Sequence, residues 1–127
     1  MKRLIFLFIA VVTIISCSIE EDYNTFNVTN NSSEEIYIAF DFDNSVISSF
    51  EDSSLESSRI IQSMSSNLFS VDESVFSGNK ELTLIIITKD VYDTNSWQDI
   101  VNDNLFDERY DLTLSELREI NNEIVYN

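Results

Sequence analysis

The stretch "ELTLIIITKD", residues 81–90, decides the fold class of this chain. Its centre, Leu82–Thr88, consists only of Leu, Ile and Thr, and β-branched residues favour strands over helices. A strand with one solvent-exposed face would alternate apolar and polar residues. A nearly continuous apolar run is instead typical of a central strand that is covered on both faces. The sequence therefore predicts a sheet with this strand in its interior.

Residues 23–42 predict a further pair of strands. Apolar residues alternate with polar ones in 23–29, and in 36–42 every second residue is Ile or Phe. The cluster Asn-Asn-Ser-Ser at 30–33 favours a turn, because Asn tolerates left-handed backbone angles. Period-two alternation on both sides of a turn predicts a hairpin.

The middle of the chain is less regular. Residues 43–58 are rich in Ser and acidic residues, show no clear period and predict a long surface loop. Strands are predicted at 60–64 and at 67–71. The only glycine, Gly78, lies in "SGNKE" and predicts a hairpin turn before the central strand.

Two short helices and a last strand follow the central strand. Ser96, with Asp99 three residues later, predicts the start of the first helix. Thr113 and Glu116 form a capping-box pattern at the start of the second. Leu112 and Leu117 predict a hydrophobic staple at the start of that helix. Its apolar stripe is predicted at Leu114, Leu117 and Ile120, and its end at Asn121-Asn122. Residues 123–127 predict a final strand.

These elements favour an immunoglobulin-like two-sheet sandwich of six or seven strands, with two short helices near the C-terminus. The domain would span residues 23–127. An α+β single sheet with helices on one face is the alternative. The chain is 43% hydrophobic and 12% aromatic, which is enough to fill a core, and with one cysteine its stability must come from packing.

The N-terminus has the order of a secretory signal peptide. Lys2 and Arg3 precede the apolar run at 4–15, which is shorter than the about 20 residues that a transmembrane helix needs. The residues "IISC" resemble the lipobox of bacterial lipoproteins, whose cysteine is acylated and becomes the new N-terminus. We therefore expect a signal peptide at 1–16 and a lipid on Cys17. An ordinary signal peptide with an incidental cysteine is the alternative.

Acidic residues follow the cysteine directly. Ser18, Glu20, Glu21 and Asp22 belong to a tether, residues 17–22, that looks like the surface-export signal of Bacteroidota lipoproteins. The resemblance implies a lipid-anchored outer-membrane protein that faces the medium. A plain acidic spacer, with the domain on the periplasmic face, is the alternative.

The C-terminal part extends this resemblance. "RYDLTLSELREINNEIVYN" at 109–127, with "SW" and "DI" upstream and "LIIITKD" before them, resembles a family of small uncharacterised lipoproteins of gut Bacteroidota. "NNSSEEIYIAFDF" at 30–42 is similar to the early strand pair of that family, whereas residues 43–77 show no likeness to it. The resemblance bears on location and fold, and it brings no catalytic residues.

The chain is strongly acidic, with a formal net charge of −16. Without residues 1–16, five basic residues remain against 23 acidic ones, which gives a net charge of −18. Nucleic acids and anionic lipid surfaces attract proteins through Lys and Arg, so both are excluded as partners. The charge serves solubility or, alternatively, attracts a cationic partner or divalent cations.

The residue types that most catalysis needs are missing. The chain has no histidine, and therefore no imidazole base or metal ligand, and its single glycine excludes a Gly-rich phosphate loop. Paired carboxylates remain, as in glycoside hydrolysis, but so small a sandwich rarely provides the deep cleft that a sugar needs. We expect no enzyme activity and no cofactor.

A calcium site is the best chemical candidate. The stretch "DFDNSVISSFED" places oxygen ligands at EF-hand-like spacing, although Val46 stands where a glycine is required and Asp52 where a glutamate is. The candidate ligands are Asp41, Asp43 and Asp52, with Ser45, Ile47 and Ser49 between them. A second acidic group consists of Asp103, Asp107, Glu108 and Asp111. Solvated acids without a metal are the alternative for both groups.

Trp97, the only tryptophan, lies close in sequence to Tyr92, Phe106 and Tyr110. On the surface, Trp97, Tyr92 and Tyr110 would stack on a sugar or anchor a protein partner. Alternatively, Trp97 packs from its short helix onto the sheet.

The leading functional prediction is a lipid-anchored, surface-exposed, non-catalytic binding or structural lipoprotein of the outer membrane. Its partner would be an extracellular or envelope protein or a glycan. The alternative, which the negative charge motivates, is an envelope immunity or inhibitor lipoprotein that neutralises a basic toxin or enzyme.

Overall fold

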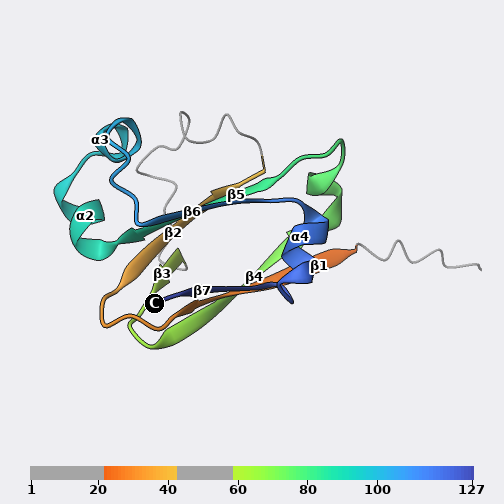
Figure 1. Ribbon diagram of the computed structural model, residues 1–127, viewed down its shortest axis with the longest axis horizontal. Helices are drawn as coiled ribbons and strands as arrows, with labels where there is room; N and C mark the ends of the chain where they lie inside the picture. The colour runs from red at the N-terminus through yellow and green to blue at the C-terminus, as the bar shows by residue number, and fades with distance from the viewer. Residues whose placement is uncertain (1–21, 43–58) are drawn as a thin grey trace, which may run out of the picture.

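The structure, a computed structural model that describes residues 22–42 and 59–127, is a sandwich of two β-sheets (Figure 1). One sheet has the strand order β4-β1-β7, with β1 at Tyr23–Asn30, β4 at Ser65–Asp72 and β7 at Glu123–Tyr126. The other has the order β3-β2-β5-β6, with β2 at Ile36–Asp41, β3 at Ile60–Ile61, β5 at Leu82–Thr88 and β6 at Glu108–Leu112. Neighbouring strands are antiparallel except β1 and β7, which are parallel.

The strand order confirms the predicted immunoglobulin-like sandwich. In immunoglobulin domains the second and fifth strands are neighbours in one sheet, and the third, sixth and seventh follow one another in the other. Here β1 and β4 take the first pair of places, and β2, β5 and β6 take the second set. The strand beside β1 comes from the C-terminal end of the domain and runs parallel to it. The single-sheet alternative is wrong.

The space between the two sheets holds the larger of two apolar clusters, here called the inter-sheet core. Every second residue of β5 points into it, and Leu82, Leu84 and Ile86 are fully buried. Phe26 of β1 stacks on Phe69 of β4 with ring centroids 5.4 Å apart. Aromatic pairs at this separation add about 0.5–1.5 kcal/mol beyond the area they bury.

The other side of β2 and β5 is covered by two helices, α2 at Lys89–Thr94 and α3 at Trp97–Asn102. Figure 1 shows both helices beside the four-stranded sheet and away from β1, β4 and β7. This layer, here called the covered face, contains Tyr37, Ala39, Ile85, Ile87, Trp97 and Ile100, all buried. The central strand is thus covered on both faces, as its sequence predicts.

The predicted helix starts are confirmed for α3 and for α4, which spans Leu114–Glu119. The Ser96 hydroxyl accepts a hydrogen bond from the backbone N–H of Asp99 at 3.2 Å. Thr113 and Glu116 form the capping box, in which each side chain accepts from the other's backbone N–H. Helix α2 was not predicted, because its N-cap residue, Thr88, also ends the apolar run of β5 and Val91, rather than a Glu or Gln, stands three residues later.

The apolar stripe predicted for α4 is only partly right. Leu117 is fully buried in the inter-sheet core and Leu114 packs against it, but Ile120 is 40% exposed. The helix ends one residue before Ile120, and Asn121 and Asn122 follow with φ of 58° and 55°. Those left-handed angles confirm the predicted helix end and redirect the chain into β7.

The hairpin predicted for residues 23–42 is wrong, because β1 and β2 lie in different sheets. The turn between them carries the chain across the sandwich. Asn30, fully buried at its start, donates from Nδ2 to the carbonyls of Glu34, Ile61 and Gln62 at 2.7, 3.2 and 3.1 Å. Alternation predicts which face of a strand is buried but does not identify its partner, which explains the error.

Further expectations for the middle of the chain need correction. The strand predicted at 60–64 contains only two residues, and Met64 has a φ of 56°. Gly78, with φ of 73°, does form a turn, but the turn links β4 to β5 in the other sheet and follows a 3-10 helix, η3 at Glu73–Phe76. Strand β6 was missed, because three of its five residues are charged and hide the alternation. The loop predicted at 43–58 lies outside the described residues.

Candidate functional site

The outer side of the three-stranded sheet is the most open candidate for binding. Phe26 and Val28 of β1 point into the inter-sheet core, so the residues between them in sequence point outward. In the described ranges, 22–42 and 59–127, no helix covers this side. We call it the bare face and define it by Tyr23, Thr25, Asn27, Thr29, Ser66, Leu68, Ser70, Asp72, Glu123 and Val125.

The strand register arranges these side chains in rows across the sheet. Thr25 lies opposite Ser70, Asn27 lies between Leu68 and Glu123, and Thr29 lies between Ser66 and Val125. The Asn27 amide donates to the Thr29 hydroxyl at 3.1 Å. The rows therefore offer a flat array of hydroxyl and amide groups that donate and accept hydrogen bonds.

Exposed apolar side chains gather on the same face. Tyr23 is 56% exposed, Leu68 69% and Val125 36%. Its two charged members, Asp72 opposite Tyr23 and Glu123 opposite Asn27, each lie at the end of a strand, in a chain with 23 acidic residues. Covering neutral polar and apolar groups costs much less free energy than covering carboxylates. This face is therefore suited to contact with an uncharged partner surface.

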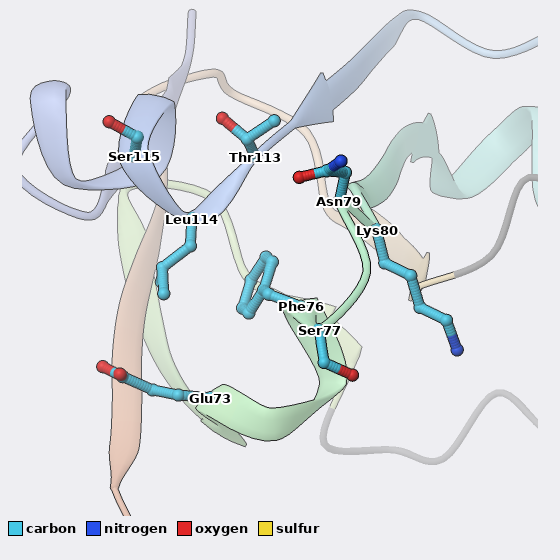
Figure 2. A pocket seen from close by; sticks show the side chains of 8 residues that line it. All are labelled: Glu73, Phe76, Ser77, Asn79, Lys80, Thr113, Leu114 and Ser115. Carbon is cyan, nitrogen blue, oxygen red and sulfur yellow. The ribbon is translucent and has the colours of Figure 1, made fainter.

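A small cleft at one end of the sandwich is the second candidate. Figure 2 shows it between η3, the turn at Gly78 and the start of α4. Phe76 and Leu114 point toward one another across it, and Lys80 extends away from it. The cleft has a volume of about 300 Å³, at the lower limit of small-molecule sites.

The polar groups at this cleft do not form a catalytic set. Its rim carries Ser77, Asn79, Thr113 and Ser115, and the Thr113 hydroxyl is already engaged in the capping box. Glu73 forms an ion pair with Arg118 of α4, which fixes η3 against that helix. Glu73, the carboxylate among the residues that line the cleft, is thus engaged by Arg118, and the rim hydroxyl and amide groups can hydrogen-bond a small polar group.

The predicted metal ligands are placed only in part. Asp41 is exposed at the end of β2, where its Oδ1 accepts from the backbone N–H of Phe42 at 2.6 Å, while Asp43 and Asp52 lie outside the described residues. Across 22–42 and 59–127, no group of three or more His, Cys, Asp or Glu side chains is placed to hold a metal ion. A calcium site stays a prediction.

Most of the second acidic group is engaged in structural hydrogen bonds. Asp107 accepts from the backbone N–H of Thr88 at 2.9 Å, and Glu108 accepts from the Tyr110 hydroxyl. Asp111 accepts from Thr83 at 2.7 Å and from Arg109 at 2.9 Å. The hydrogen bond from Arg109 holds the pKa of Asp111 below its ordinary value, against the effect of burial.

The three candidate aromatic residues do not form one surface. Trp97 is 8% exposed and packs in the covered face, where Tyr92 lies with its ring centroid 4.1 Å from that of Tyr37. Tyr110 packs on the opposite side of the sheet, against the inter-sheet core. The structure therefore shows the alternative in which Trp97 packs from its helix onto the sheet.

Sequence reasoning did not identify the bare face, although it recognised the strand. The available signal was the pattern Thr25-x-Asn27-x-Thr29, in which the outward positions of an otherwise apolar strand are all neutral and polar. In β4 the outward residues Ser66 and Ser70 are likewise neutral and polar, whereas Leu68 between them is apolar and Asp72 at the end is charged.

The N-terminal site residues are described only at Asp22. Its carbonyl accepts from the backbone N–H of Glu73 at 2.8 Å, so the chain enters β1 beside η3. Cys17, Ser18, Glu20 and Glu21 lie outside the described residues. Among the helices that are described, none is long and apolar enough to cross a membrane. Comparison with protein-family models, with curated proteins and with solved structures found no match to this chain.

Proposed function

We propose that the protein is a lipid-anchored, non-catalytic binding module on the surface of the bacterial outer membrane. The bare face would contact its partner, an extracellular or envelope protein or a glycan. The observation that carries the proposal is the contrast between a chain of net charge −16 and an open sheet face whose charged residues, among those described, are Asp72 and Glu123. A mostly uncharged face with exposed apolar side chains on an otherwise acidic protein marks a place for contact.

The position of β1 supports the anchoring part of this proposal. The strand begins at Tyr23, and Asp22 is already fixed to η3 by its carbonyl. Asp22 lies five positions after Cys17 in the sequence, and a fully extended segment of that length reaches about 18 Å. A lipid on Cys17 would therefore hold a folded domain close to the headgroups and limit its range of orientations.

Replacement of the cysteine tests the anchor. Cys17→Ala should abolish lipid labelling and release the protein from the membrane fraction, because the thioether carrying the lipid chains is lost. Lipid labelling that survives Cys17→Ala would contradict the lipoprotein assignment.

The side of the membrane is tested separately. Replacing Glu20, Glu21 and Asp22 by Ala should leave the lipid in place but protect the protein from protease added to intact cells. Unchanged cleavage would mean that these acids serve only as a spacer.

The bare face is tested with a photo-reactive amino acid at Thr25, in cells that carry the full chain. We expect it to capture a protein or a glycan. The matched control is the same group at Asp99, on the exposed side of α3. Capture of a basic protein at Asp99 and of nothing at Thr25 would contradict the proposal and favour the immunity or inhibitor function.

A further inference from the structure

Strand β4 forms one edge of its sheet, and this edge differs from the other three (Figure 1). All eight of its residues pair with β1 in one uninterrupted register, without a bulge. Natural sheet edges are protected from pairing with other chains by short length, charge, proline or bulges. Residues 65–71 contain no charge, no proline and no glycine, and the one charged residue of β4 is Asp72 at its last position, so the strand is unprotected over most of its length.

The remaining edges carry the protection that β4 lacks. Strand β6 contains Glu108, Arg109 and Asp111, strand β3 has two residues, and strand β7 has four and includes Glu123. Strand β4 is therefore the edge that combines the greatest length with a single charge at its end.

We propose that two copies of this protein associate through their β4 edges, which pair antiparallel and join the two three-stranded sheets into one six-stranded sheet. Antiparallel pairing of a strand with its own copy is self-complementary and closes after two subunits. Eight residues give a paired length of about 27 Å. The hydrogen bonds would be made by the N–H and C=O groups of β4 that point away from β1 and that no described strand pairs.

Side-chain alternation fixes the register of this pair. A two-fold axis perpendicular to the sheet keeps the bare faces of both copies on one side. Outward-facing residues of one copy must therefore lie opposite outward-facing residues of the other. The axis then passes through a residue rather than between two. Leu68 is at the middle of β4, points outward and is 69% exposed.

With Leu68 on the axis, the two Leu68 side chains meet and bury one another. Ser66 lies opposite Ser70 of the second copy, and Ser65 lies opposite Val71. No like charges face each other between 65 and 71. This pairing explains why Leu68, a large apolar side chain, is exposed at the centre of the edge.

Charge favours a second copy at this edge and at no other. Elsewhere the acidic surfaces of two copies repel, and a basic partner would be drawn to those surfaces rather than to a neutral strand. A strand pair alone is smaller than a standard interface of about 1,200–2,000 Å², so association in free solution is weak. If the proposed lipid anchor holds, confinement to one membrane raises the effective concentration. The edge argument itself does not depend on the anchor.

The test is disulfide cross-linking of the full chain in cells. Leu68→Cys places two thiols at the axis, where Cα atoms of opposite residues lie about 4.5–5.5 Å apart, within disulfide range. We expect a reducible band at twice the mass of the chain. Unsubstituted protein serves as the control for any dimer formed through Cys17.

The register is tested with two matched controls. Ser66→Cys alone and Ser70→Cys alone should stay monomeric, because each thiol faces a serine of the second copy. Cells that express both variants together should form the dimer. Equal dimer in all single variants, or Leu68→Cys linked only to a different protein, would overturn the proposal.

Salt and charge provide a second measurement. Because the two copies are both strongly acidic, the cross-linked fraction should rise with ionic strength as repulsion is screened. Leu68→Lys should abolish the dimer, whereas Val125→Lys, on the same face but on β7, should not. A Leu68→Lys protein that folds and dimerises as before would also overturn the proposal.

Discussion

The two outer sides of the sandwich have opposite chemistry. On the covered face, Ile85 and Ile87 of β5 are buried beneath α2 and α3. On the bare face, the equivalent outward positions of β1 are Thr25, Asn27 and Thr29, and they face solvent. The comparison shows how the sequence of a strand determines what must pack on it, because an apolar side leaves water only if another element covers it.

Among the changes that test this comparison, replacement of Trp97 should lower the free energy of unfolding the most. Trp97→Ala removes the largest buried side chain that α3 contributes to the covered face, and such truncations cost about 3–5 kcal/mol. The free energy of unfolding can be measured by urea titration followed by circular dichroism. The matched change on the bare face, Leu68→Ala, should stay within about 0.5 kcal/mol. Equal losses in the two variants would mean that the bare face is covered in solution.

A smaller effect is expected at the start of the covering helix. Ser96→Ala removes the hydroxyl that accepts from the Asp99 N–H and should cost about 1 kcal/mol. Hydrogen exchange of α3 amides should accelerate, while amides of β1 and β4 should change little. Equal acceleration in both sheets would show that the helical layer does not open independently of the sandwich.

Two tyrosines, Tyr37 and Tyr110, face opposite sides of the four-stranded sheet. Their replacement should change the stability at neutral pH the least of the variants considered. Burial, helped by the hydrogen bond to Glu108, raises the pKa of Tyr110 to about 12, and burial also raises the pKa of Tyr37 from 10.0. Both shifts favour the protonated folded state, so this contribution to stability is complete below pH 10. It is lost as pH rises above 10 and, for Tyr110, through about 12.

Replacement of each tyrosine by Phe separates the two sides. Tyr110→Phe should flatten the decline in urea midpoint above pH 10 more than Tyr37→Phe does, because only Tyr110 has its pKa raised as far as about 12. The reverse order would indicate that the covered face, rather than the inter-sheet core, controls alkaline unfolding.

Local signals in the sequence predicted local structure well. The capping box at Thr113 and Glu116, the Ser96 cap and the two-sided burial of β5 are all present as predicted. Each depends on residues at most a few positions apart, or on the composition of a single strand. Such features are decided by short-range geometry, which the sequence contains directly.

Strand pairing and the binding surface could not be predicted in the same way. Strand β1 pairs with β4 and β7, and nothing in 23–30 distinguishes those partners from β2. The bare face exists only once Thr25, Ser70 and Val125, from three separate strands, lie side by side. Strand β6 was missed for a related reason. Its residues Tyr110 and Leu112 can be recognised as inward-facing only once the strand is paired with β5.

The place of β7 beside β1 has a consequence for how the protein folds. Strand β1 is the centre of its sheet, and both of its partners come later in the chain. The Asn24 amide bonds to the Asn122 side chain, 98 positions away, at 3.2 Å. Contacts of such high sequence separation slow folding, since the closure entropy must be overcome before the strands pair. Among the described strands, the first to be synthesised is therefore completed by the last, and the three-stranded sheet forms only after β7 has left the ribosome.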